Sequence, residues 1–457
     1  MTNYQKQLQT KSADVVVLGG GPAGFCAAVC AAREGASVLL IEKEGFCGGM
    51  ATAGLVAPFM TCYDSSGKTM LIRGIFEEVV NRLINVGGAI HPSKIEASTG
   101  YTSYITAGHI HVTPFKAESL KLMCDQMLEE AGVEILYHTS FVDSIVKDGK
   151  IQKVIVAKKE GLVAIAPKVV IDCTGDGDCA AASGVPFTVG DGSGKMQPAT
   201  MFFKIGNVDS KQIDADIEKN KDNFYRKDGV NYRSMHWWVS QARQNGDWDM
   251  NRVSIGLFKG VDDDEWNINT SRIMGIDGAN SKSLTDGEIE GRKQVDMIFK
   301  FIKKYIPGCQ NAKLLQTGST LGIRETRHIH GEKTVTLNDV LECKVPDDSV
   351  VIAANSVDVH GRFGPASNEY ITLPEGKYYG IPYGALLPKG ISNMLVAGRC
   401  ISAESSAAGA FRVMPPCMLL GQAAGTAAAL AKDGNVKNVD VNLLKATLEK
   451  RGVLLKL

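Results

Sequence analysis

The chain has 457 residues, of which 44% are hydrophobic and 22% are charged, enough apolar material for one large domain or two intertwined domains. Lysine and arginine together number 50, as do aspartate and glutamate, so the chain lacks the positive field that nucleic-acid binding requires. The 11 cysteines include no C-x-x-C pair, which predicts reduced thiols in a cytoplasmic protein. Residues 1–12 are polar, and the most apolar segment, 415–431, is short and interrupted by Gln422, so we expect neither an export signal nor a membrane span.

The first part of the chain begins with a strand, a helix and a second strand. Residues 14–18 are apolar, residues 22–34 are rich in alanine, and residues 37–41 are apolar again before the acid Glu42. This order is typical of a βαβ unit about thirty residues long.

Two helices and a meander of strands follow. Helical periodicity predicts helices at 75–86 and 117–131. Residues 132–178 then alternate short β-rich runs with glycine and charged turns, which predicts a β-meander that returns to a buried strand at 169–173.

The composition of the sequence changes after Gly190 and returns to that of the first part near residue 350. The intervening region is richer in charge and tryptophan and reads as a second domain. Inside it we expect a helix at 286–305 that starts with a capping box of Thr285 and Glu288 and ends before Pro307. The apolar, glycine-rich texture then returns, so we expect the C-terminus to complete the first domain.

Gly19, Gly21 and Gly24 form G-x-G-x-x-G between the first strand and the first helix. In this pattern the first glycine permits the turn, the second lets the backbone approach a pyrophosphate, and the third allows close helix packing. Glu42, at the end of the second strand, is placed to accept hydrogen bonds from ribose hydroxyls. Together these features favour a dinucleotide site over a turn with a purely structural role.

Two distant segments favour a flavin over a nicotinamide. Gly48, Gly49 and Gly54 form a flexible loop just after Glu42, along which a longer cofactor could lie. A strand ending at Gly398 and a helix starting near residue 414 follow almost four hundred residues later. The N-terminal end of that helix could stabilise negative charge on a reduced flavin ring.

The motifs GGGPAGFCAAVCAAREGASVLLIEK, FCGGMATAG, VVIDCTGDGD, LGIRETRHIHG, YYGIPYGALLP and MPPCMLLGQAAGTAAALA span the chain from end to end. In this combination the chain resembles the broad FAD-dependent oxidoreductase family related to fumarate reductase and succinate dehydrogenase flavoproteins. The resemblance implies an α/β fold with a Rossmann-like FAD-binding domain of the glutathione-reductase type, interrupted by an α+β substrate (cap) domain. The implied parts are an FAD-binding domain at 1–190 with an excursion into the cap near 88–112, a substrate domain at 191–345, and a completing part at 346–457.

The resemblance also implies which residues contact the FAD. On the adenosine and pyrophosphate side these are Gly19, Gly21, Pro22, Ala23, Gly24, Glu42 and Lys43. Along the ribityl chain and ring they are Gly49, Met50, Ala51 and Thr52, with Val142 near the adenine and Thr174, Gly175 and Asp178 on the phosphate side. At the far end they are Gly398, Arg399, Met418 and Leu419.

The sequence departs from the respiratory members of that family near Cys47. No histidine falls in residues 46–59, so we do not expect FAD to be tethered through histidine. Cys47 could form a thioether or act as a thiol, but a packed thiol is the favoured interpretation. A second glycine turn at Gly175 carries Asp176 and Asp178, which would repel a pyrophosphate, so no independent nicotinamide domain is expected.

The candidates for chemistry are His360, Arg324 and Arg412. Arg324, within the run from Arg324 to Arg327, could bind a carboxylate through its planar fork or belong to a structural ion-pair cluster. His360, two residues after Asp358, could carry a proton with a pKa near the working pH. Arg412 could bind substrate or compensate the charge of reduced flavin. The aromatic residues Tyr101, Tyr104, Trp237 and Trp238 are candidates for the lining of the substrate cleft or for core packing.

The sequence therefore predicts an FAD-dependent dehydrogenase or reductase that exchanges a hydride between flavin N5 and a small organic substrate, with an anionic substrate as one option. A flavin monooxygenase and a flavoprotein subunit that passes electrons to a partner protein remain alternatives. The pairs His109/His111 and His328/His330 lack further ligands at metal-binding spacing, so we expect no metal.

Overall fold

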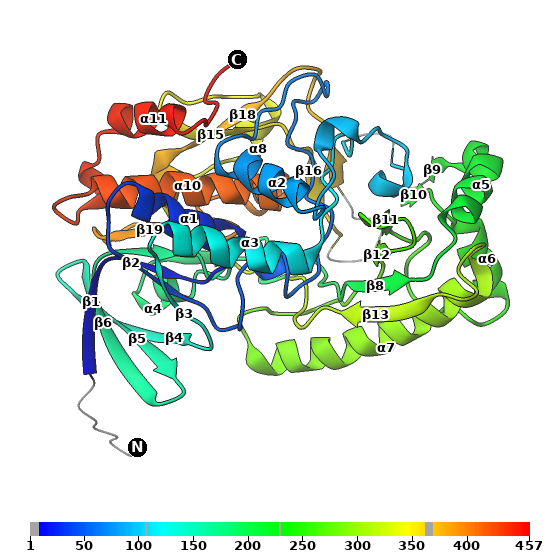
Figure 1. The fold of residues 1–457 in the computed structure, drawn as a ribbon, viewed down its shortest axis with the longest axis horizontal. Coiled ribbons are helices and arrows are strands. Elements are labelled where there is room, and N and C mark those ends of the chain that lie inside the picture. The colour runs from blue at the N-terminus through cyan, green and yellow to red at the C-terminus, as the bar shows by residue number, and fades with distance from the viewer. Residues whose placement is uncertain (1–8, 106–107, 228–229, 362–368) are drawn as a thin grey trace.

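The computed structural model describes residues 9–105, 108–227, 230–361 and 369–457. The beginning of the polar N-terminal segment lies outside these ranges. The described residues form two hydrophobic cores: a large one around the N-terminal and C-terminal parts of the chain, and a smaller one built from Tyr104 and from side chains between Ala199 and Leu321. Figure 1 shows the two parts side by side, with the smaller one in green at the right.

A mixed seven-stranded sheet organises the large core. Its parallel strands are β3 (Glu134–Leu136), β2 (Val38–Ile41), β1 (Gln9–Leu18), β6 (Gly161–Asp172) and β19 (Met394–Val396). β4 (Ser140–Lys147) and β5 (Lys150–Lys158) form an antiparallel meander with the first half of β6, whereas the second half of β6 pairs with β19. The last strand of the sheet thus comes from a segment more than two hundred residues downstream.

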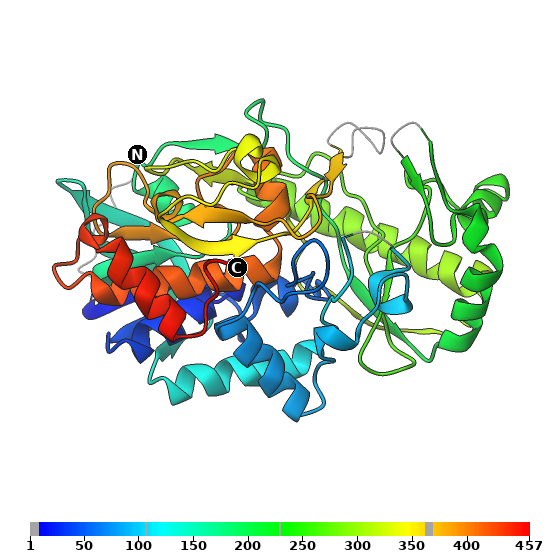
Figure 2. The ribbon, with the colours of Figure 1, turned by 90° about the horizontal axis from the view of Figure 1, so that it is seen from above.

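Helices α1 (Pro22–Arg33) and α10 (Met414–Leu430) pack against each other beside this sheet (Figures 1 and 2). Gly421 and Gly425 make the close approach possible, because an added Cβ would lie 2.0 Å from the Ala23 carbonyl oxygen and 2.2 Å from that of Ala27. The helices α2 (Ile75–Asn85), α3 (Ala117–Glu130) and α11 (Val441–Lys450) complete this layer.

Shorter elements connect the layers around the large core. The antiparallel strand pairs are β15 (Ser349–Ala353) with β18 (Tyr379–Pro382), β16 (Val357–Val359) with β17 (Glu369–Ile371), and β7 (Phe187–Val189) with β14 (Arg327–Ile329). The short helices are α4 (Asp178–Ala182), α8 (Leu337–Leu341) and α9 (Ser405–Phe411).

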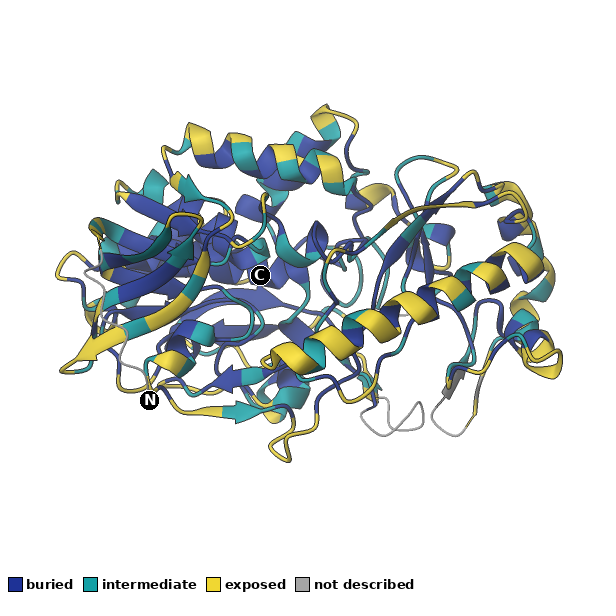
Figure 3. Cartoon of the chain, turned by 90° about the horizontal axis from the view of Figure 1, so that it is seen from below, coloured by how far each residue is buried: buried dark blue, intermediate teal, exposed yellow. Residues whose placement is uncertain are grey.

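The smaller core, which we call the second unit, contains an antiparallel sheet in the order β11-β12-β8-β13. Its strands are β8 (Phe203–Gly206), β11 (Leu257–Lys259), β12 (Trp266–Ile268) and β13 (Lys313–Thr317), and a hairpin of β9 (Tyr225–Lys227) and β10 (Val230–Tyr232) lies beside them. The helices are α5 (Ser210–Asn220), α6 (His236–Gln244) and α7 (Ser281–Tyr305). Figure 3 shows α7 as a long helix with an exposed outer face.

The predicted elements of the first part are confirmed to within a few residues for β2, α1, α2 and α3, and the meander is confirmed as β4-β5-β6. The predicted start of α7 is wrong. The helix begins at Ser281, and the side chain of Asn280 accepts a hydrogen bond from Ser283 N at 3.0 Å. Thr285 instead donates to the carbonyl of Ser281, and Glu288 accepts from Leu321 N, so neither side chain caps the helix.

In the described ranges, no individual helix has the length and apolarity to cross a membrane; α9 and α10 reach that threshold only as a pair, with a 94° bend between them.

Candidate functional site

The turn between β1 and α1 adopts a backbone conformation and a close packing that side chains at its glycine positions would disturb. Gly19 adopts φ +92°, and an added Cβ would lie 2.6 Å from the carbonyl oxygen of Cys173. At Gly24 an added Cβ would lie 1.7 Å from the carbonyl oxygen of Gly19, so helix and strand meet there without a side chain between them. At Gly21 the nearest atom would be Gly49 Cα at 3.9 Å, so this backbone borders open space rather than the core.

The first turn of α1 starts from this open side. Gly21 precedes Pro22, which occupies the first helical position and needs no N–H partner there. The other N–H groups of the first turn have no partner within the helix, and together with the positive end of the helix dipole they favour an anion.

Glu42 lies at the end of β2 beside this turn. It is 6% exposed, and its carboxylate accepts hydrogen bonds from Gly20 N at 2.6 Å and Glu44 N at 2.8 Å. Burial raises the pKa of this carboxyl, and the two backbone donors oppose the rise. Glu42 lines the cavity, and each carboxylate oxygen can accept more than one hydrogen bond, which suits this side chain to hydroxyl donors.

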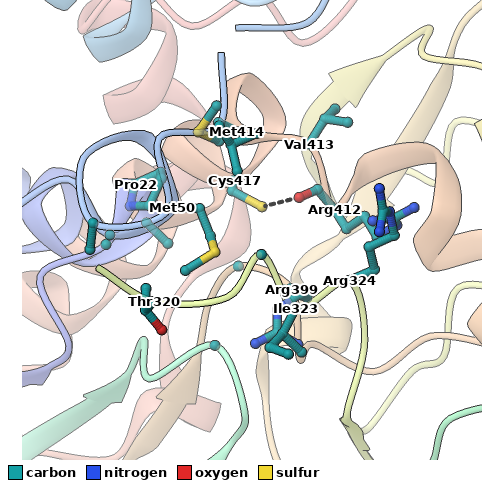
Figure 4. Close-up of a pocket in the computed structure, with 18 of the residues that line it drawn as sticks. Pro22, Met50, Thr320, Ile323, Arg324, Arg399, Arg412, Val413, Met414 and Cys417 are labelled. Atoms are coloured by element: carbon teal, nitrogen blue, oxygen red, sulfur yellow. Dashed lines mark hydrogen bonds between the residues drawn. The ribbon is translucent and has the colours of Figure 1, made fainter. Parts of the chain in front are cut away.

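A cavity of about 450 Å³ begins at this turn and continues between the large sheet and the second unit. Gly49 and Met50 line it after the turn, followed by Gly398 and Arg399. Its far end is lined by His360, Arg324 and Arg412 together with first-turn residues of α10, as the close-up in Figure 4 shows for the two arginines. The three candidates for chemistry therefore share a cavity with the glycine turn.

The acids of the second glycine turn are paired with arginines. Arg399 Nη2 lies 2.6 Å from Asp176 Oδ1, and Arg327 Nη1 lies 2.8 Å from Asp178 Oδ1. The buried Asp172 holds the turn itself, because it accepts from Thr174 Oγ1 at 2.7 Å. This turn lines the same cavity as the first one, and the ion pairs neutralise the repulsion that its sequence suggested.

Gln197 joins two of the residues at the far end. Its side-chain oxygen accepts from Arg412 Nη2 at 3.1 Å and from His360 N at 3.0 Å. Arg412 Nη2 also donates to the Asp358 carbonyl at 3.0 Å, while Arg324 Nη1 donates to Pro198 O at 2.5 Å and Thr200 Oγ1 at 2.7 Å. The guanidinium groups are thus oriented by neutral oxygens rather than by direct carboxylate partners.

His360 lies beside Asp358, with Nε2 at 3.5 Å from Oδ2. Burial and the positive charge of Arg324 lower the pKa of His360 to about 3, although Asp358 opposes the shift. The expectation of a pKa near the working pH is therefore wrong, and the imidazole is neutral at neutral pH. Burial alone would raise the pKa of Asp358, but His360, Arg412 and Arg324 outweigh it and hold that pKa below its ordinary range.

Comparison with known proteins identifies the family to which the chain belongs. The profile of the family described as "FAD dependent oxidoreductase" matches residues 14–448. The chain belongs to this family of FAD-dependent oxidoreductases.

A thiamine thiazole synthase of Methanococcus aeolicus is 27% identical over 182 residues, which are 38% of this chain and 58% of that protein. The match thus spans little more than half the length of that curated relative.

Solved structures with a similar course of the chain have low identity. A geranylgeranyl bacteriochlorophyll reductase-like protein of Thermoplasma acidophilum is 13% identical with a TM-score of 0.45, covering 96% of this chain and 83% of that one. The L-amino acid deaminase of Proteus myxofaciens is 10% identical with a TM-score of 0.47, covering 97% and 95% of the two chains.

Most residues expected to contact FAD line the cavity of the oxidoreductase. These are Gly19, Gly21, Pro22, Ala23, Glu42, Lys43, Gly49, Met50, Thr174, Gly175, Asp178, Gly398 and Arg399. The open backbone at Gly21, the free first turn of α1 and the acceptor at Glu42 fit the pyrophosphate and ribose of a dinucleotide.

Six expected contacts lie outside the lining: Gly24, Ala51, Thr52, Val142, Met418 and Leu419. The side chain of Val142 is 48% exposed, and Thr139, Ser140 and Phe141 line the cavity in its place. Met418 and Leu419 are buried in the core, whereas Met414 and Cys417 of the same helix reach the cavity. In the first turns of α10, the residues at i and i+3 face the site.

Two further expectations concern side chains near the site. Cys47 is buried, Tyr137 OH donates to its sulfur, and burial raises the pKa of its thiol to about 12, so the interpretation as a packed thiol is favoured. Trp237 and Trp238 both donate to Asp216 Oδ2 and do not line the cavity. Phe202, Phe258 and Asn269 provide the lining from the second unit instead.

Gln197 was missed by sequence reasoning. It lies in the loop between β7 and β8, where neither a motif nor a periodic pattern marks it.

Proposed function

We propose that this FAD-dependent oxidoreductase is a dehydrogenase or reductase for a small organic anion. The observation that carries the proposal is the continuity of one cavity from the glycine turn at Gly19 to the guanidinium groups of Arg324 and Arg412. A dinucleotide that starts at the turn extends along Gly49 and Met50 toward the arginines. Bound there, FAD supplies hydride exchange at its ring.

Arg324 and Arg412 bind an anionic group of the substrate. A guanidinium offers a planar pair of donors that matches a carboxylate, and neutral partners already hold both side chains in place. Because both guanidinium groups are held in place, they fix the orientation of the substrate relative to the cofactor. This orientation lowers the entropic cost of reaching the transition state.

His360 accepts the proton that leaves the substrate when a hydride is removed. Its imidazole is neutral at neutral pH and therefore able to accept. An anionic substrate beside the arginines offsets the positive field that lowers the pKa of His360, so substrate binding raises the basicity of the imidazole.

In this proposal the second unit serves as the substrate (cap) domain, and the division into 1–190, 191–345 and 346–457 stays a prediction. Phe202, Phe258 and Asn269 border the cavity from this side. Apolar rings at this position exclude water from the reacting groups and strengthen the electrostatic interactions of the arginines. The reaction then requires a separate electron donor or acceptor.

The proposal is tested by mixing the purified yellow holoenzyme anaerobically with a library of organic acids and neutral metabolites while the flavin absorbance is recorded. We expect an organic acid to bleach the flavin, and we expect Arg324→Met to slow bleaching at least about 100-fold, since a lost charged hydrogen-bonding partner costs about 3 kcal/mol. Arg292→Met, at an exposed arginine that pairs with Glu288 on α7, is the matched control.

Other outcomes discriminate among the alternatives. Bleaching by NADPH alone, followed by oxygen consumption with a substrate, would establish a monooxygenase instead. Bleaching only after a partner protein is added would establish an electron-transfer subunit, and a chain that purifies colourless and refuses FAD would contradict the proposal altogether.

A further inference from the structure

Glu325 is a buried acid that has no part in the reaction proposed above. It is 1% exposed and lies behind the lining of the cavity. One oxygen of its side chain accepts a hydrogen bond from Gln197 N at 2.7 Å, and the other accepts from Ser405 Oγ at 2.5 Å. Glu325 therefore joins the loop at 197–200 to the start of α9, although these segments lie far apart in the sequence.

Arg324 holds the same loop from the neighbouring position in the chain. Its guanidinium group donates to Pro198 O and Thr200 Oγ1. The backbones of Thr200 and Gly322 also exchange hydrogen bonds at 2.8 Å and 3.1 Å, which keeps the two segments side by side. The contact of Glu325 with the loop thus fixes the acceptors that orient Arg324.

Gln197 transmits the contact to the other two side chains at the far end of the cavity. Its backbone N–H is held by Glu325, and its side-chain oxygen accepts from Arg412 Nη2 and from His360 N. Because the donor and the acceptor belong to one residue, a displacement of the Gln197 backbone moves the acceptor away from both partners.

Helix α9 connects Glu325 to Arg412 by a second route. Ser405, which donates to Glu325, is the first residue of the helix, and Arg412 follows its last residue. Arg412 N donates to Ala408 O at 2.9 Å, so the backbone of Arg412 continues the turn of the helix. Glu325 therefore constrains Arg412 through the helix backbone as well as through Gln197.

We propose that Glu325 is a positioning residue that sets the directions of Arg324 and Arg412 and the place of His360 relative to them. The inference rests on the proposed function, in which these three side chains act on the substrate. Glu325 touches neither the substrate nor the cofactor and acts through the loop at 197–200 and through α9.

The charge of Glu325 has an effect of the opposite sign. Burial lowers the pKa of Arg412, and the negative charges of Asp358 and Glu325 oppose this shift. The same negative charge makes the far end of the cavity less attractive to an anion. Removing the charge while the contacts are kept should therefore preserve or strengthen the binding of an anionic substrate, whereas disturbing the contacts while the charge is kept should weaken it.

Two conservative variants separate these effects. Glu325→Gln keeps the length of the side chain, an oxygen that accepts from Gln197 N and an amide that can donate to Ser405 Oγ. Glu325→Asp keeps the charge but is one methylene too short to reach both partners. The probe is the organic acid of the anaerobic screen that bleaches the parent holoenzyme fastest, used below saturation. We expect bleaching of Glu325→Asp to be at least about tenfold slower, and that of Glu325→Gln to stay within about threefold of the parent or exceed it.

A double variant tests whether Glu325 acts through Gln197. In Gln197→Met the shared acceptor for Arg412 and His360 is already absent, so adding Glu325→Asp should slow bleaching by less than about threefold further. Losses from two independent structural roles would instead multiply.

Glu404→Asp is the matched control. Glu404 is an exposed acid directly before Ser405, and its side chain accepts from Leu337 N at 2.7 Å. This contact leads to α8 rather than to the loop at 197–200, so the same shortening should leave the bleaching rate unchanged.

Crystal structures of the oxidised holoenzymes give a second reading that needs no substrate. The hydrogen bond of 3.1 Å from Arg412 Nη2 to the Gln197 side chain should be kept in Glu325→Gln and broken in Glu325→Asp. The bound-flavin absorbance reports folding. If Glu325→Asp loses FAD, Ser405→Ala replaces it, and we expect this variant to bleach about threefold more slowly because Glu325 keeps its contact with Gln197.

Bleaching of Glu325→Asp at the parent rate, equal losses in Glu325→Asp and Glu325→Gln, or losses that multiply in the double variant overturn the inference. The proposed function fails by a different reading, namely the absence of any small molecule that reduces the flavin anaerobically. In that case the crystal structures still decide whether Glu325 places Arg412.

Discussion

At the contact between α1 and α10, replacing Gly421 by alanine is expected to change the free energy of unfolding through two opposing effects, helix propensity and steric overlap. In an exposed helix, Gly421→Ala would stabilise the protein by about 1 kcal/mol through helix propensity. Here the new Cβ would lie 2.0 Å from the carbonyl oxygen of Ala23, whereas real Cβ contacts stay beyond 3.0 Å, so the helices must separate by about 1 Å. Backbone lies on both sides of the contact, so we place the overpacking cost near the upper end of the usual range, about 3 kcal/mol. The expected net loss is about 2 kcal/mol.

Urea unfolding of the holoenzyme at fixed FAD concentration measures this loss, and FAD titration of the apoprotein measures its effect on the site. FAD affinity should fall as well, because the same shift displaces the first turn of α1 from the cavity. Thr447→Ala in α11 is the control, where helix propensity acts without a helix contact of this kind and predicts a small gain. A Gly421→Ala protein that is as stable as the parent or more stable would refute the steric argument.

Three further outcomes are expected. Gln197→Met should lower kcat/KM about 10-fold to 100-fold, because Arg412 and His360 lose a shared hydrogen-bond acceptor. Gln197→Glu should retain much of the activity because it keeps that acceptor. Equal losses in the two variants would contradict the positioning role of Gln197. The free energy of unfolding should decrease as the pH falls from about 6.5 toward 3, because the folded state holds the pKa of His360 at about 3 and the unfolded chain takes up the proton earlier. His360→Asn should flatten that decrease in urea titrations at stepped pH, and an unchanged slope would contradict the assignment. Acid precipitation should release FAD into the supernatant of both the parent and Cys47→Ser, and flavin retained in the parent pellet alone would indicate attachment at Cys47.

The end of the cavity at the first glycine turn could be predicted from the sequence because its determinants are local. Gly19, Gly21 and Gly24 lie within six residues, and Glu42 follows one helix and one strand later, so the pattern alone fixes their relation. Backbone geometry at this end tolerates no alternative, as the clash of a Cβ at Gly24 shows.

Side-chain direction limited the prediction elsewhere. The helix at 414–430 was identified from the sequence. Because it is apolar on every side, the sequence did not indicate whether Met414 and Cys417 or Met418 and Leu419 face the cavity. In β4, an exposed strand of the meander, Phe141 rather than Val142 lines the cavity. In both cases the choice depends on how the element is rotated against its neighbours, and that rotation is set by tertiary packing.

The residues around Gln197 illustrate a harder limit, because they come from distant parts of the chain. Gln197 precedes β8, whereas Arg412 and His360 lie more than one hundred and fifty residues downstream. Nothing in the sequence around Gln197 indicates that its side-chain oxygen accepts from Arg412 and from the backbone of His360.

The arginines along the cavity are held in two different ways. At the second glycine turn, Arg399 and Arg327 are paired directly with Asp176 and Asp178. At the far end, Arg324 and Arg412 donate to neutral oxygens of the loop at 197–200. A neutral acceptor fixes the direction of a guanidinium group without cancelling its charge, and a buried charge gains most from a partner of opposite sign. This difference is the reason for proposing that the anionic group of the substrate binds at the far end rather than at the turn.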